Sequence, residues 1–146
     1  EKTEENSAVA AEVGASEHQA GLALDLYVPQ FGGWAFTKSA AGRFVDTNCR
    51  DYGFIVRYPS YGEKQTGIPY EPWHLRYVGL PHSQIIMDEY LTLEEYIDLL
   101  KPGSFYQYGS YLISHQNGRV IDAPSGWKHV TVSEDNLGGY LFTWEL

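Results

Sequence analysis

The sequence predicts an α+β fold, in which helices flank an antiparallel sheet and a β-rich extension follows. The first observation is the alternation in Leu22–Leu26, which puts leucines on one face of a strand and Asp25 on the other. The second is the helical spacing of apolar residues between Ala41 and Tyr52. The third is the tail after Gly103, where short apolar runs alternate with turn residues.

The elements of the first part are expected in a simple order. Residues 1–13 are polar and then alanine-rich, which favours a frayed arm or a short helix. The expected elements are a strand over 22–27, a helix over 41–52 ended by Gly53, a strand over 54–58, a strand around His74 and a helix near His82. A further helix is opened by the capping box that starts at Thr92.

The tail is expected to be a small β structure. Its predicted strands cover residues 105–114, 119–122, 127–132 and 139–145, with Asn117-Gly118 as the hairpin turn between the first two. We therefore divide the chain into a main domain over residues 1–101 and a C-terminal β-rich extension over residues 102–146.

Composition supports a small folded protein that does not bind nucleic acid. The 146 residues are 43% hydrophobic, which is enough for one core, and the net charge is −9. Phosphate binding needs a basic face, whereas the ten lysines and arginines are scattered. The single cysteine, Cys49, excludes an internal disulfide and is expected to be buried.

Two blocks of sequence carry the residues of a metal site. His18 and Asp25 lie in the first block, and Glu71 and His74 lie in the second. If the two strands pair in one sheet, Asp25 and His74 project into one cleft, with His18 brought in by the turn at Gly21. Each residue alone has an ordinary structural explanation, but three ligands and a spare carboxylate together indicate a catalytic zinc site.

Both blocks resemble the signatures of the VanY-type D-alanyl-D-alanine carboxypeptidases, a branch of the LAS zinc peptidases. That group also includes phage endolysins and the hedgehog fold. The family pattern S-x-H-x-x-G-x-A-x-D falls on Ser16, His18, Gly21, Ala23 and Asp25, and the pattern E-x-W-H falls on Glu71, Trp73 and His74. The stretch Tyr52–Pro59, then Thr66, Gly67 and Tyr70, also resembles this branch.

The resemblance implies a site as well as a fold. The fold would be a hedgehog/D-Ala-D-Ala-peptidase-like antiparallel sheet with flanking helices. His18, Asp25 and His74 would bind Zn2+, and Glu71 would be the general base. Ser16, Gln19 and Trp73 would lie near the substrate. Arg76 is expected to be structural and paired with a carboxylate.

The implied reaction is the removal of the C-terminal D-alanine from peptidoglycan stem peptides by metal-activated water. The alternatives are a peptidoglycan L,D-carboxypeptidase, an endolysin-type endopeptidase and a non-catalytic zinc-bearing wall-binding module. Because the substrate is peptidoglycan, we expect an extracytoplasmic location, in the cell envelope or secreted.

One departure from the family concerns the segment before Ser16. VanY-type enzymes carry there an S-G-Y-R-S-like segment whose arginine holds the terminal carboxylate of the substrate. This chain has no arginine before Arg43. We therefore expect the N-terminal part of the domain to be missing. Either it was removed, or it is supplied by a companion fragment or a swapped partner, or the protein is a variant without it.

Overall fold

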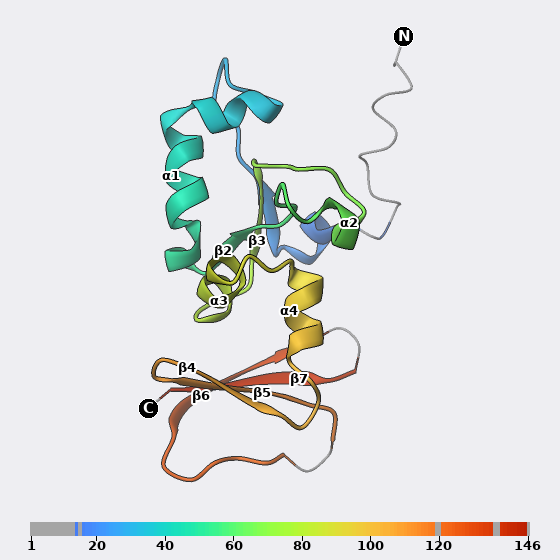
Figure 1. Cartoon of the computed structure of the whole chain (residues 1–146), viewed down its shortest axis with the longest axis vertical. Helices are drawn as coiled ribbons and strands as arrows, with labels where there is room; N and C mark the ends of the chain where they lie inside the picture. The colour runs from blue at the N-terminus through green and yellow to red at the C-terminus, as the bar shows by residue number, and fades with distance from the viewer. Residues whose placement is uncertain (1–13, 15, 119–120, 136–137, 146) are drawn as a thin grey trace. The chain divides into compact units, whose positions relative to one another are not determined.

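The computed structural model describes residues 14, 16–118, 121–135 and 138–145 (Figure 1). The expected arm over residues 1–13 lies outside them. The chain forms two compact units, one up to Glu94 and one over Glu95–Leu146. Within the described residues, no helix is long and apolar enough to cross a membrane.

The first unit contains an antiparallel sheet of three short strands in the order β1-β3-β2. The strands are β1 (Ala23–Asp25), β2 (Phe54–Val56) and β3 (His74–Tyr77). All three are confirmed near their predicted places, and β1 and β2 are shorter than the ranges expected. Apolar residues of β2 and β3 pack with the helical region, because Val56, Leu75 and Cys49 form one buried cluster.

The expected helix over 41–52 is confirmed with a tighter last turn. It is α1 (Ala40–Asn48) followed by the 3-10 helix η4 (Cys49–Tyr52). Ser39 caps α1, since its Oγ accepts a hydrogen bond from the N–H of Gly42 at 2.9 Å. Gly53 ends η4 with a φ of 82°, a left-handed conformation that glycine adopts without strain.

The other helices of the first unit are short. The 3-10 helices η2 (Glu17–Ala20) and η3 (Gly33–Lys38), and α2 (Glu63–Thr66), are not predicted from the sequence. The helix expected near His82 is α3 (His82–Asp88), which packs on β2 and η4. The next helix, α4 (Leu93–Leu99), begins directly after Thr92, as expected.

The second unit is a four-stranded antiparallel sheet in the order β4-β5-β7-β6. The strands are β4 (Phe105–Tyr108), β5 (Tyr111–Gln116), β6 (Lys128–Glu134) and β7 (Tyr140–Glu145). Its core includes Ile113 of β5 and two aromatic residues of β7, Phe142 and Trp144, whose rings stack with centroids 5.5 Å apart.

Two predictions for the tail are wrong. The run over residues 105–114 is not one strand, because Tyr108 pairs with Tyr111 in a hairpin whose turn is Gly109-Ser110, with a φ of 55° at Gly109. The expected strand over 119–122 is absent at residues 121–122, and residues 119–120 lie outside the described part. Asn117-Gly118 is therefore not the hairpin turn, and β5 pairs with β4 and β7.

Candidate metal centre

The three predicted metal ligands meet at the pair of strands β1 and β3. Asp25 is the Cα partner of His74 across this antiparallel pair, which confirms that the two blocks share a sheet. His18 lies in η2, just before β1. Gly21 ends η2 with a φ of 69° and turns the chain so that His18 comes back toward the start of β1.

Two of the separations between ligand atoms are close to those found around a tetrahedral metal ion. Oδ1 of Asp25 lies 3.1 Å from Nδ1 of His74 and 3.5 Å from Nε2 of His18. One ligand atom from each residue lies within 4.8 Å of the others. Ligand atoms that surround a tetrahedral zinc ion are separated by about 3.4 Å. Two imidazoles and one carboxylate grouped in this way are the donor set of a catalytic zinc site, which keeps a fourth position open.

The orientation of the His18 ring is set by a hydrogen bond. Its Nδ1 lies 3.2 Å from the carbonyl oxygen of Ala23. A carbonyl oxygen can only accept, so Nδ1 carries the proton and Nε2 is left as the ligand atom. The side chains of His18 and Asp25 are 40% and 53% exposed, whereas that of His74 is 8% exposed. The cluster is thus open to solvent on the side of the first block.

Glu71 is positioned by the backbone that leads into β3. Its N–H donates to the carbonyl oxygen of Tyr58 at 3.0 Å, and its own carbonyl accepts from the N–H of His74 at 3.1 Å. Its Oε2 lies 3.7 Å from Nδ1 of His74. Burial raises the pKa of the Glu71 carboxyl group, and the neighbouring Asp25 adds to this effect. A buried carboxyl group with a raised pKa beside a metal site is suited to proton transfer.

The three residues predicted to contact substrate lie next to the ligands. Ser16 precedes η2, and its carbonyl oxygen accepts from the N–H of Gln19 at 3.1 Å. The carbonyl oxygen of Trp73 accepts from the N–H of Leu26 at 2.9 Å, one step beyond the pair of Asp25 and His74. The side chain of Gln19 is exposed, and Ser16 and Trp73 are half-buried. Their contacts with substrate stay predictions.

Glu17, Arg57 and Arg76 form a cluster of charged side chains beside His74. The sequence predicts only that Arg76 pairs with a carboxylate. Oε1 of Glu17 lies 2.7 Å from Nε of Arg57 and 3.0 Å from Nη1 of Arg76. Burial alone would raise the pKa of Glu17, but His74 and the two arginines outweigh it, and the pKa falls to about 2. Two features of the sequence could have indicated this cluster. Glu17 directly precedes the predicted ligand His18, and Arg57 directly follows the apolar strand β2.

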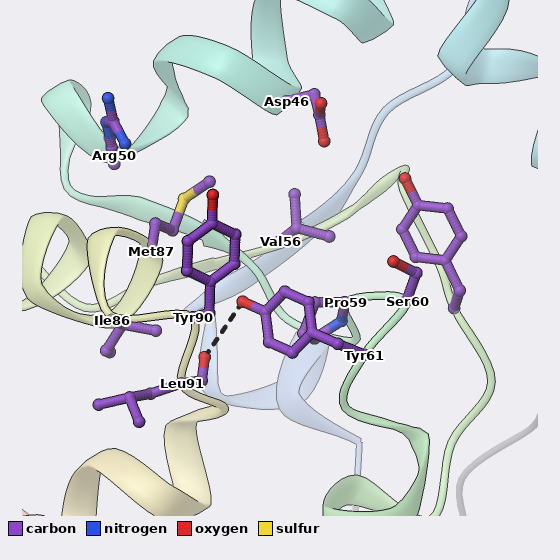
Figure 2. Close-up of a pocket in the computed structure, with 11 residues that line it drawn as sticks. Asp46, Arg50, Val56, Pro59, Ser60, Tyr61, Ile86, Met87, Tyr90 and Leu91 are labelled. Atoms are coloured by element: carbon purple, nitrogen blue, oxygen red, sulfur yellow. Dashed lines mark hydrogen bonds between the residues drawn. The ribbon is translucent and has the colours of Figure 1, made fainter.

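A separate hollow of about 230 Å³ lies elsewhere in the first unit (Figure 2). Its lining includes Val56 and the tyrosines Tyr61 and Tyr90, and it contains none of the predicted ligand, base or substrate residues. The rings of Tyr61 and Tyr90 meet edge to face with centroids 5.8 Å apart, and the Tyr61 hydroxyl donates to the carbonyl oxygen of Leu91. The cluster of His18, Asp25 and His74 is therefore distinct from this hollow.

Comparison with known sequences places both blocks in one family. The family model described as D-alanyl-D-alanine carboxypeptidase, VanY, matches residues 1–80, which is more than half of the chain. A curated D-alanyl-D-alanine carboxypeptidase of Enterococcus faecium is 37% identical over 142 residues, which cover 89% of this chain and 44% of the relative. The chain thus spans less than half the length of this relative.

Solved structures agree with the sequence comparison. The vancomycin-resistance D,D-dipeptidase VanXYg, in complex with a D-Ala-D-Ala phosphinate analogue, is 30% identical with a TM-score of 0.75, covering 90% of this chain and 59% of that one. A mutant of the D,D-pentapeptidase VanY in complex with Zn(II) is 40% identical with a TM-score of 0.53, covering 62% and 49%.

A third solved structure is that of the LD-carboxypeptidase LdcB. It is 49% identical with a TM-score of 0.55, covering 58% of this chain and 41% of that one. The match with VanXYg extends over both compact units, and all three comparisons agree with the α+β fold expected from the sequence. The chain is a member of the VanY family of D-alanyl-D-alanine carboxypeptidases.

Proposed function

We propose that the protein is a zinc-dependent D-alanyl-D-alanine carboxypeptidase that trims the C-terminal D-alanine from peptidoglycan stem peptides. The observation that carries this proposal is the convergence of His18, Asp25 and His74 within 4.8 Å, with the carboxyl group of Glu71 beside them. The family relationship supports the substrate class, since relatives of this chain are carboxypeptidases named for that dipeptide.

The ligand residues would hold the ion, and Glu71 would move the proton. Bound zinc supplies a Lewis acid that makes a water molecule more acidic and polarises the scissile carbonyl group. Oε2 of Glu71 takes the proton from the attacking water and returns it to the nitrogen of the leaving D-alanine. A raised pKa lets one carboxyl group serve in both steps, because it holds the proton more readily than an ordinary glutamate.

L,D-carboxypeptidase activity, which removes a D-alanine that follows an L-configured residue, is the second candidate. The likeness to the LD-carboxypeptidase LdcB supports it, at 49% identity. The two activities differ in the configuration of the residue before the scissile bond, while the metal ligands and the base would be the same. A non-catalytic wall-binding module would have no use for a buried carboxyl group placed at the ligands, so Glu71 argues against that alternative.

The experiment is a comparison of two synthetic stems. The zinc-loaded protein is incubated with a pentapeptide ending in D-Ala-D-Ala and, separately, with a tetrapeptide ending in a single D-alanine, and the products are identified by mass spectrometry. We expect the pentapeptide to lose one alanine and the tetrapeptide to stay intact. Cleavage of the tetrapeptide alone would replace the proposal by the L,D activity, and cleavage of neither would reject both.

We also propose that the protein works outside the cytoplasmic membrane, because its proposed substrate lies in the cell wall. Fractionation of the source cells, followed by detection with an antibody, tests this proposal. Detection in the cytosolic fraction alone would contradict it.

A further inference from the structure

His74 directs its two ring nitrogens at different carboxyl groups: Nδ1 faces Asp25, and Nε2 faces Glu17. Nε2 of His74 and Oε2 of Glu17 lie 3.8 Å apart. Both atoms are buried, and among the residues that the structure describes neither has a hydrogen-bond partner. A buried polar atom without a partner is destabilising, and here a nitrogen and a carboxylate oxygen with that property face each other.

The other oxygen of Glu17 is already bound. Oε1 receives Nε of Arg57 at 2.7 Å and Nη1 of Arg76 at 3.0 Å. Arg57 is itself held by a two-point contact with Glu94, at 2.6 and 3.1 Å. This arrangement fixes the carboxylate of Glu17 in place and leaves Oε2 as the atom that can accept a further hydrogen bond.

We propose that Glu17 is a positioning residue of the metal centre. Its carboxylate accepts a hydrogen bond from Nε2–H of His74, and so holds the ring with an unprotonated Nδ1 toward Asp25. A metal-binding histidine commonly donates its other ring N–H in this way, which fixes the tautomer and makes the ligand nitrogen more basic. This inference rests on the proposed metal site and adds a residue outside its ligand set.

The two histidines would then be oriented by different acceptors. His18 is held by a backbone carbonyl, at 3.2 Å. His74 would be held by a carboxylate, after Nε2 and Oε2 of Glu17 approach by about 1 Å to the length of a charge-assisted hydrogen bond. The alternative is that Glu17 only neutralises the two arginines. Under that alternative the ring proton of the metal-free protein lies on Nδ1, where Oδ1 of Asp25 can accept it at 3.1 Å. The two explanations therefore predict different tautomers of His74.

Glu17→Gln tests the inference, with Glu94→Gln as the matched control. Both changes remove one negative charge from Arg57, but only Glu17 faces His74. In Glu17→Gln the two arginines hold the amide oxygen, so the amide NH2 donates to Nε2 of His74 and the ring proton moves to Nδ1, where it competes with the metal. Zinc alone is the probe, in a titration against a chromophoric chelator. We expect the affinity to fall by about 10- to 100-fold in Glu17→Gln, and to stay at the wild-type level in Glu94→Gln.

A second readout needs no metal. Nitrogen-15 spectra of the metal-free protein, recorded at a pH at which they show a neutral His74 ring, report which ring nitrogen carries the proton. We expect Nε2–H in the wild type and in Glu94→Gln, and Nδ1–H in Glu17→Gln. A wild-type protein with the proton on Nδ1, or a Glu17→Gln variant that binds zinc as tightly as the wild type, would overturn the inference.

The two readouts separate failure of this inference from failure of the proposed function. If the wild type binds no zinc, the proposed metal site fails, and the tautomer of His74 still decides the role of Glu17. If Glu17→Gln does not fold, the wild-type spectrum decides by itself, because Nδ1–H there is incompatible with a hydrogen bond from Nε2 to Glu17.

Discussion

Asp25 and His74 are direct partners across the antiparallel strands β1 and β3, and Oδ1 of Asp25 lies 3.1 Å from Nδ1 of His74. Directly opposite residues of an antiparallel pair project to the same face of the sheet. The register alone therefore sets two of the three predicted ligands side by side. A slip of one residue would turn one of them to the other face, so the proposed metal centre depends on this register.

The first prediction concerns metal binding. His74→Ala removes the ligand that is 8% exposed and central to the cluster, and should abolish stoichiometric zinc binding. His129→Ala, at an exposed histidine of β6, is the matched control and should keep one equivalent. Metal analysis after dialysis measures both. A full equivalent of zinc in His74→Ala would show that the ligand assignment is wrong.

The second prediction concerns the base. Glu71→Gln keeps the shape of the side chain and removes its ability to accept a proton, so zinc content should stay the same. Turnover of the stem peptide should fall by roughly 100- to 10,000-fold, the usual contribution of a positioned acid-base group. Glu63→Gln, at an exposed glutamate of α2, is the control and should leave turnover unchanged. Wild-type turnover in Glu71→Gln would exclude Glu71 as the base.

The grouping of the three predicted ligands could be foreseen from the sequence because it follows from local rules. Alternation identified the strands around Asp25 and His74, and the glycine at position 21 indicated the turn that returns His18. The partners of Glu17 could not be predicted in this way. Arg57 lies 40 residues further along the chain and reaches Glu17 only through the tertiary fold.

In the tail, local sequence signals did not identify the correct hairpin turn. Asn117-Gly118 is a favourable hairpin sequence, yet the observed turn is Gly109-Ser110. A turn forms a hairpin only where the strands on both sides can pair, and β5 finds its partners in β4 and in β7. The turn propensity of a dipeptide does not report on that pairing, so the register of the sheet had to come from the structure.

The third prediction concerns packing in α1. A Cβ atom at Gly42 would lie 2.0 Å from the carbonyl oxygen of Phe36, which is part of the backbone and cannot move aside easily. Although alanine favours helices more than glycine does, we expect Gly42→Ala to lower the free energy of unfolding by about 1–3 kcal/mol, because overpacking outweighs helix propensity. Thr47→Ala, at an exposed position of the same helix, should have little effect. Urea unfolding compares them, and a higher midpoint for Gly42→Ala would contradict the packing seen here.

The fourth prediction concerns the dependence of stability on pH. His82 begins α3 and is 8% exposed, and burial lowers its pKa from 6.5 to about 4. In the unfolded chain the imidazole regains its ordinary pKa, so between these two values the unfolded state binds more protons than the folded state. The contribution of His82 to the free energy of unfolding is therefore complete above about pH 6.5 and is lost as the pH falls toward 4, by roughly 3 kcal/mol at most.

His82→Gln should weaken this dependence, because glutamine has no proton to bind. The measurement is urea unfolding of the metal-free protein at about pH 7 and about pH 4.5, because most of the expected change in the free energy of unfolding falls between these two values. The wild type should lose more of its free energy of unfolding than His82→Gln over this interval, while groups that the two proteins share contribute equally to both and cancel. His129→Gln, at an exposed histidine, should behave like the wild type. An identical loss in His82→Gln and the wild type would mean that His82 is not held neutral by burial in the folded state.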